Sequence, residues 1–212
     1  MDKNVFRSLS YGVYVIGTMD GDRPTGCTAN SAMQITSSPA TLAVSINHDN
    51  YTNSCIEKTG FFSCSILAET SDPGLIGGFG FRSGKDCDKF EGVEFKISVG
   101  VPVILDSCGY VVCKVIDRME TSTHTVFLGE VIEGEVFKKD APMTYAYYHN
   151  VIKGKSPKNA PTYLPEENAA EEKKESVYVC KICGYEHKGE EPGADFKCPI
   201  CGMGRDKFEK KQ

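Results

Sequence analysis

The sequence lacks the features that would place the protein in a membrane or on a nucleic acid. No window approaches about 18 uninterrupted apolar residues, the length that a membrane-spanning helix needs, and the amino terminus has no apolar stretch typical of a signal peptide. Dense tracts of lysine and arginine are also missing, and the formal net charge of -5 argues against binding to nucleic-acid phosphates. We therefore expect a cytoplasmic protein with an acidic or neutral partner.

Internal repeats are absent too, as are the glycine-rich phosphate motifs of the Rossmann and P-loop folds. With 40% apolar and 25% charged residues, the composition is that of a globular protein able to bury a core. Residues 153–176 hold three prolines, many charged residues and almost nothing large enough to anchor a core. We predict a folded unit at 1–152, a flexible linker at 153–176 and a small second unit at 177–212.

The ten cysteines fall into two groups. Four form two matched Cys-x-x-Cys pairs, Cys180 with Cys183 and Cys198 with Cys201. Two residues between cysteines let both sulfurs reach one ion, and two such pairs complete a tetrahedron of thiolates, which also staples a unit too small to fold on burial alone. The spacing leaves open a structural zinc ribbon or an iron centre. The other six are expected to be buried structural thiols: Cys27, Cys55, Cys64, Cys87, Cys108 and Cys113.

The first unit is predicted to consist mostly of strands. Short runs of Val, Ile, Thr and aromatic residues, bounded by turn-forming residues, predict strands at 14–18, 41–47, 61–67, 110–117 and 125–132. Asp20-Gly21-Asp22 predicts a hairpin turn. Helices are expected around 5–9, at 50–59 ending at Gly60, and from Asp72-Pro73 onward. Many strands, few helices and no regular βαβ alternation favour an antiparallel barrel over a doubly wound sheet.

The segments around the paired cysteines, residues 178–185 and 198–202, resemble rubredoxin in the shortened form fused to rubrerythrin-type proteins. The segment between the pairs is short, which removes a peripheral loop but none of the ligands. The resemblance implies one mononuclear iron per chain, held by Cys180, Cys183, Cys198 and Cys201 and cycling between the ferrous and ferric states.

A one-electron carrier fused to a larger domain needs a source of electrons. Nicotinamide gives up two electrons as a hydride and iron takes one, and a flavin can bridge the two. Four stretches resemble the flavin reductase family of FMN-binding split barrels: 26–31, 44–52, 81–90 and 124–131. The resemblance implies an antiparallel split barrel that binds FMN across most of residues 1–150.

Carried over residue by residue, this resemblance implies a set of FMN contacts. Small polar residues would lie along the flavin ring, namely Thr28, Ala29, Asn30 and Ser31. The ribityl chain and phosphate would be held by Ser45, Asn47, Asn50 and Thr52, and further phosphate donors would be Arg82, Ser83 and Lys89. His124 would be catalytic, near the flavin or the nicotinamide. The family often has an acid just before this histidine, whereas Ser122 and Thr123 precede it here.

The order of the two domains resembles the high molecular weight rubredoxins of anaerobic bacteria. That resemblance implies an NAD(P)H-dependent electron-transfer oxidoreductase, in which electrons pass from NADH through FMN to iron and on to a flavodiiron protein that reduces nitric oxide or dioxygen. Split barrels of this family place FMN at a two-fold interface, so a homodimer is expected. Two alternatives stay open: a passive relay reduced by a separate reductase, and a flavin-binding module with a structural zinc ribbon.

Overall fold

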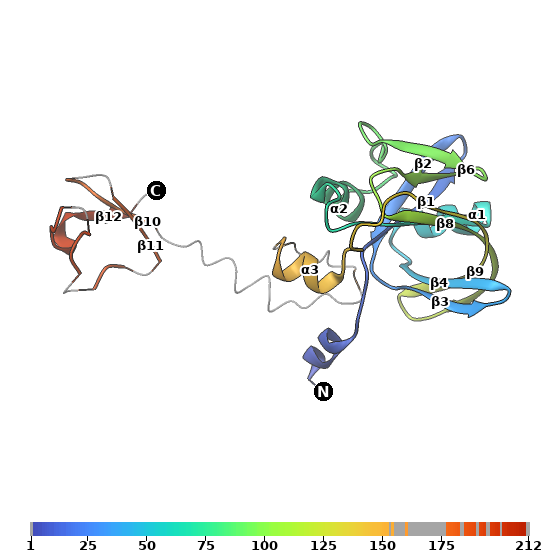
Figure 1. The fold of residues 1–212 in the computed structure, drawn as a ribbon, viewed down its shortest axis with the longest axis horizontal. Helices are drawn as coiled ribbons and strands as arrows, with labels where there is room; N and C mark the ends of the chain where they lie inside the picture. The colour runs from blue at the N-terminus through green and yellow to red at the C-terminus, as the bar shows by residue number, and fades with distance from the viewer. Residues whose placement is uncertain are drawn as a thin grey trace. The chain divides into compact units, whose positions relative to one another are not determined.

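The computed structural model describes residues 2–152, 154, 160, 177–182, 185–189, 191–193, 196–199 and 201–210. The chain divides into two compact units, Met1–Tyr163 and Leu164–Gln212 (Figure 1). The predicted linker at 153–176 lies outside the described residues except for Gly154 and Ala160, so its boundaries stay a prediction. Among the described helices, none is long and apolar enough to cross a membrane.

The first unit is built on a seven-stranded antiparallel sheet with the order β2-β1-β5-β8-β9-β4-β3. Its strands are β1 (Tyr14–Asp20), β2 (Arg23–Ala29), β3 (Ala32–Ser37), β4 (Ala40–Asn47), β5 (Phe61–Ile66), β8 (Gly109–Glu120) and β9 (His124–Val136). A separate hairpin pairs β6 (Phe95–Ser98) with β7 (Val101–Ile104). The five predicted strands are confirmed, and so is the turn after Asp20, where Gly21 has a φ of 62°.

The sheet must curl because its two edge strands are neighbours in the sequence. Strands β2 and β3 lie at opposite edges, yet Asn30 and Ser31 alone connect them. A flat sheet would separate the edges by about 29 Å, from six steps of about 4.8 Å each. The chain from Ala29 to Ala32 spans at most about 11 Å. The predicted antiparallel barrel is therefore confirmed, with a seam between β2 and β3.

Local capping signals explain the helices. Helix α1 (Tyr51–Thr59) starts at Asn50, whose side chain accepts a hydrogen bond from Thr52 N, and ends at Gly60 in the left-handed conformation. Helix α2 (Pro73–Phe81) is capped by the Asp72 side chain. Both were predicted. The predicted N-terminal helix is a 3-10 helix, η1 (Lys3–Ser8), and α3 (Tyr145–Asn150) was missed.

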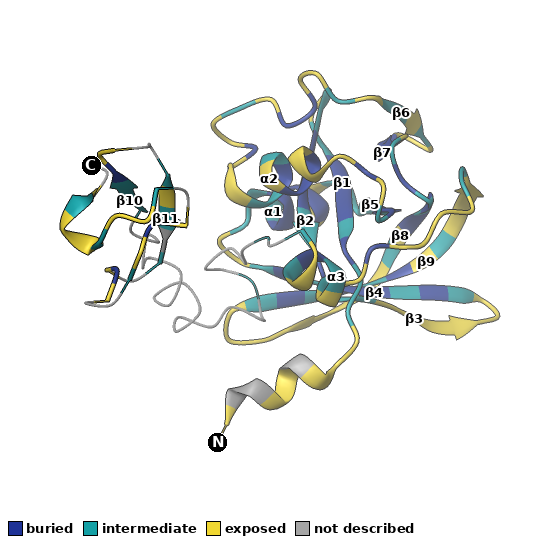
Figure 2. Cartoon of the chain, turned by 60° about the vertical axis from the view of Figure 1, so that its left-hand side comes forward, coloured by how far each residue is buried: buried dark blue, intermediate teal, exposed yellow. Residues whose placement is uncertain are grey.

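The core fills the barrel and the space beneath α2. One cluster gathers around Phe62 and Phe127, and another around Phe79 and Phe90. Figure 2 shows these buried segments in dark blue, while β3 is largely exposed. Four of the six scattered cysteines are buried as predicted: Cys27, Cys55, Cys64 and Cys113. The prediction was wrong for Cys87 and Cys108, which are half-buried because they lie in connections between elements.

The second unit contains a small three-stranded sheet. Strand β10 (Val177–Cys180) lies between β11 (Glu186–Lys188) and β12 (Phe208–Lys210), and a short 3-10 helix, η2 (Arg205–Lys207), precedes β12. The Phe208 ring packs 5.3 Å from Phe196 and 6.4 Å from Tyr185, centroid to centroid. Two cysteine-bearing segments are thus fixed by a minimal sheet and a few aromatic rings.

Candidate functional site

Three predicted flavin contacts share the outer face of the barrel sheet. Asn47 on β4 pairs with His124 on β9, and Ser45 pairs with Val126. Directly paired residues of antiparallel strands have side chains on the same face. The alternate residues of these strands, Val44, Ile46 and Phe127, belong to the buried core. Ser45, Asn47 and His124 therefore point away from the core together.

A second group of predicted contacts converges on the Cys27 side chain. Burial raises the pKa of the Cys27 thiol to about 11, against the opposing effects of hydrogen bonds with Thr52 and Asn50 and the charge of Lys89. Thr52 is 2% exposed and Lys89 is 6% exposed. The backbone N of Asn50 donates to Asn47 O at 3.1 Å, so the second group adjoins the first.

Lys89 is a buried cation whose partners are neutral. Its Nζ donates to Phe79 O at 3.1 Å and to Arg82 O, the carbonyls at the end of α2, and within the described part of the chain it forms no ion pair with a carboxylate. Burial lowers the pKa of its ammonium group. A buried ammonium without a counter-ion is costly, and α1 directs its N-terminus to the same place through Asn50 and Thr52. An anionic group such as a flavin phosphate fits this donor set.

The remaining predicted contacts are more dispersed. At the seam, Thr28 Oγ1 donates to Ile76 O at 3.4 Å, and Ser31 Oγ donates to Asn30 Oδ1 at 2.9 Å. Ala29 ends β2. Arg82 and Ser83 are exposed, and the Ser83 hydroxyl accepts a hydrogen bond from Lys85 N, as in a turn. Their assignment as phosphate donors stays a prediction.

Sequence reasoning missed the residue that fastens the loop after α2. Arg23 donates through its guanidinium to Gly84 O at 2.8 Å and forms an ion pair of 2.8 Å with Asp20. A Cβ atom at Gly84 would collide with Thr25 Oγ1, so this close approach requires glycine. The Asp20-x-x-Arg23 spacing across the hairpin turn is visible in the sequence, but nothing local indicates that Arg23 reaches a loop 61 positions away.

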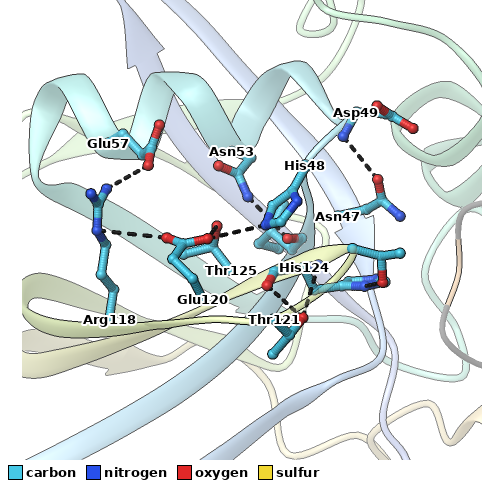
Figure 3. A network of polar contacts seen from close by, with 12 residues as sticks. Asn47, His48, Asp49, Asn53, Glu57, Arg118, Glu120, Thr121, His124 and Thr125 are labelled. Atoms are coloured by element: carbon cyan, nitrogen blue, oxygen red, sulfur yellow. Dashed lines mark hydrogen bonds and ion pairs between the residues drawn. The ribbon is translucent and has the colours of Figure 1, made fainter.

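His124 is oriented by hydroxyl groups of its own turn. Thr123 Oγ1 lies 2.8 Å from His124 Nδ1. Thr121 Oγ1 accepts from His124 N at 3.0 Å and donates to His124 O at 2.7 Å. Figure 3 shows these contacts at the tip of the β8–β9 hairpin. The orientation of the imidazole is thus set within the turn itself.

The second unit brings three of the four predicted metal ligands together. The Sγ atoms of Cys180, Cys198 and Cys201 lie within 4.8 Å of one another, and Cys180 Sγ and Cys201 Sγ are 3.7 Å apart. Cys183 lies outside the described residues. Thiolates about 2.3 Å from a central ion at tetrahedral corners are about 3.8 Å apart, whereas disulfide sulfurs are bonded at about 2.05 Å. The cluster therefore fits a tetrahedral thiolate site for iron or zinc.

Comparison with known proteins gives the class. The flavin reductase like domain matches residues 6–155, and the rubrerythrin, rubredoxin-like domain matches residues 178–209. The chain belongs to the flavin reductase like family and carries a rubredoxin-like domain, which makes it an oxidoreductase that works by flavin-linked electron transfer. Its cofactors are a flavin and iron.

One relative is a high molecular weight rubredoxin of Moorella thermoacetica, which is 40% identical over 99% of both chains. This confirms the family predicted from the sequence. A ferric-chelate reductase (NAD(P)H) of Archaeoglobus fulgidus is 38% identical over 77% of this chain and 98% of its own. Among solved structures, an NADH:FAD oxidoreductase of Streptomyces globisporus in complex with NAD and FAD fragments is 26% identical, with a TM-score of 0.61 over 67% of this chain and 84% of that one.

Proposed function

We propose that the protein oxidises NADH at FMN held in the barrel, passes the electrons to iron in its second unit, and delivers them to a flavodiiron-type nitric oxide or dioxygen reductase. The observation that carries the proposal is one chain with both a flavin reductase like barrel and a cluster of cysteine thiols. When bound, the flavin supplies the exchange between a two-electron hydride and single electrons. One NADH provides electrons for two ferric centres and leaves NAD+ and a proton.

The residues of the barrel would divide the work of binding. Lys89, Asn50 and Thr52 would hold the FMN phosphate, since they combine a buried ammonium with the start of α1. Thr28, Ala29, Asn30 and Ser31 would contact the ring edge from the barrel seam. Arg82 and Ser83 would add donors from the loop after α2, and Ser45 and Asn47 would contact the ribityl chain.

His124 would face the nicotinamide. It is half-buried and lies on the outer sheet face beside Asn47. The relative solved with NAD and FAD fragments and the reductase named for NAD(P)H support a nicotinamide donor. We propose NADH as that donor.

A homodimer would cover this outer face. Met33 on β3 and Met119 on β8 are 65% and 60% exposed, and strand register places both on the face that carries Ser45 and His124. Exposed apolar residues gathered around a binding site are typical of an interaction surface. A second copy would bury the methionines and screen the flavin from solvent.

In the second unit, Cys180, Cys183, Cys198 and Cys201 would hold the iron as thiolates. A flexible linker at 153–176 would keep the iron at an effective concentration in the millimolar range around the flavin, so that transfer within the protein need not await a diffusional encounter.

The test is an anaerobic NADH titration of the freshly purified full chain, with its flavin and metal content determined first. The proposal expects FMN and one iron per chain. It also expects NADH to bleach both chromophores, with one NADH consumed for each FMN and one NADH for every two irons. If NADH bleaches neither the flavin nor the iron but a separate reductase bleaches both, the protein is a passive relay. If the cysteine cluster contains zinc, the second unit is a structural zinc ribbon. Reoxidation by a flavodiiron protein supplied with nitric oxide or dioxygen tests the acceptor.

A further inference from the structure

A polar network joins the loop before α1 to the tip of the β8–β9 hairpin, and none of the roles assigned above uses it (Figure 3). His48 Nε2 lies 3.1 Å from Glu120 Oε2, and the same carboxylate oxygen accepts a hydrogen bond of 3.1 Å from Thr125 Oγ1. The backbone N of His48 donates to Thr123 O at 2.9 Å. His48 therefore holds both arms of the hairpin tip, one with its ring and the other with its backbone.

The position of this contact follows from where the strand ladders end. Asn47 and His124 form the last pair between β4 and β9, and Glu120 and Thr125 form the last pair between β8 and β9. Residues beyond these pairs are not held by the sheet. The turn that orients His124 lies there, so its attachment to the rest of the barrel depends on contacts such as those of His48.

The charges around His48 fix the geometry of the contact. Arg118 Nε lies 3.6 Å from Glu120 Oε1, and the other end of the Arg118 guanidinium pairs with Glu57 on α1. A carboxylate can only accept hydrogen bonds, so His48 Nε2 must carry a hydrogen.

We propose that His48 is a positioning residue for His124. By fastening the hairpin tip to the loop before α1, it keeps the His124 imidazole in place beside Asn47 on the outer face. The proposal rests on the proposed function in that His124 faces the nicotinamide. The side chains of His48 and Glu120 are 39% and 51% exposed, so the effect on opening of the tip is that of a surface ion pair, about two- to fivefold.

The test uses the full chain and three variants. His48→Phe keeps a ring and the backbone N-H but loses the contact with Glu120, whereas His48→Gln can place an amide N-H near the original Nε2. Glu57→Gln is the matched control, because it removes another carboxylate between α1 and β8 without touching His48. If His48→Phe does not fold, Glu120→Ala removes the same contact from the hairpin side.

The first measurement is hydrogen exchange at the amides of Thr121 and His124, both hydrogen-bonded within the turn. We expect exchange about two- to fivefold faster in His48→Phe, and wild-type exchange in His48→Gln and Glu57→Gln. The second measurement is the rate of flavin reduction by NADH. It should fall by up to about the same two- to fivefold in His48→Phe at unchanged flavin affinity and recover in His48→Gln, because small displacements of a reacting group cost rate more than binding.

The outcomes distinguish a failure of the positioning role of His48 from a failure of the proposed function. Unchanged exchange in His48→Phe, or equal loosening in Glu57→Gln, overturns the positioning role. Faster exchange with an unchanged rate of reduction overturns it as well, because the position of His124 would then not matter to the reaction. A wild-type protein that NADH does not reduce, combined with the expected exchange pattern, refutes the proposed function while leaving His48 as the residue that holds the tip.

Discussion

Replacing Lys89 by methionine tests the anion site directly. Methionine keeps most of the unbranched chain of lysine but lacks the ammonium group, which is buried and bonded to two carbonyls. A charge-assisted hydrogen bond is worth about 1.5–3 kcal/mol. We therefore expect FMN to bind about ten- to a hundredfold more weakly, since about 1.4 kcal/mol corresponds to a factor of ten. Riboflavin has the same ring and ribityl chain without the phosphate, and its affinity should not change.

The assay titrates flavin-free protein with each flavin and monitors binding through the quenching of flavin fluorescence. Lys85→Met is the matched control, because Lys85 is an exposed lysine on the same loop. Equal losses of FMN and riboflavin affinity would show that Lys89 merely holds the end of α2. Unchanged affinity for both flavins would show that the phosphate does not bind at Lys89.

The pH dependence has a definite sign. Burial lowers the pKa of Lys89 below its ordinary value of 10.5 in the flavin-free protein. The free-energy cost of burying the charged ammonium is therefore full below the lowered pKa, and it disappears as pH rises from that pKa towards 10.5. A bound phosphate stabilises the ammonium and raises the pKa again. FMN affinity should therefore fall as pH rises through the lowered pKa of Lys89 in the flavin-free state, while riboflavin affinity stays level.

Three further predictions concern other parts of the chain. Cys198→Ser should lower the iron content well below one per chain and abolish reduction of external acceptors while NADH still bleaches the flavin; equal loss of both activities would contradict the order of transfer. Gly84→Ala should lower the free energy of unfolding in urea by about 1–3 kcal/mol through the clash with Thr25 Oγ1, and a Thr25→Ala background should recover much of it. Because the pKa of Cys27 is about 11, its thiolate fraction at pH 8 is about one in a thousand, so alkylation in the native state should reach half-buried Cys87 before buried Cys27, as peptide mapping would show.

Signals confined to a few neighbouring residues predicted the structure well. The Asn50 cap and the Gly60 stop bound α1 as expected, because capping depends on side chain and backbone groups within one turn. The Cys-x-x-Cys spacing likewise predicted a cluster of thiols, of which the described residues Cys180, Cys198 and Cys201 lie together. Strand ends were less accurate: β8 continues to Glu120 and β9 to Val136 because the two strands support each other beyond the core, which residue composition does not reveal.

Contacts between distant parts of the chain could not be predicted. His48 and Glu120 are 72 positions apart and belong to a loop and a strand end whose separate patterns give no sign of the pairing. The exposed strand β3 was missed for a related reason, because it lacks the buried alternation by which strands are recognised. The resemblance to flavin reductases named Asn47 and His124 as candidate site residues, but the register of β4 and β9 was needed to show that the two share a face.

The closure of the barrel and the location of the predicted ring contacts have a common cause. Strand β2 pairs with β1 and strand β3 pairs with β4, so the outer edges of β2 and β3 face each other across the seam. Edge strands present backbone N-H and C=O groups that the sheet does not use. The connection of Asn30 and Ser31 is too short to let these edges separate, and Ser45 N donates to Ser31 O at 3.0 Å beside it. If the flavin ring binds at this seam as we propose, its polar edge would face backbone groups that the sheet leaves unused.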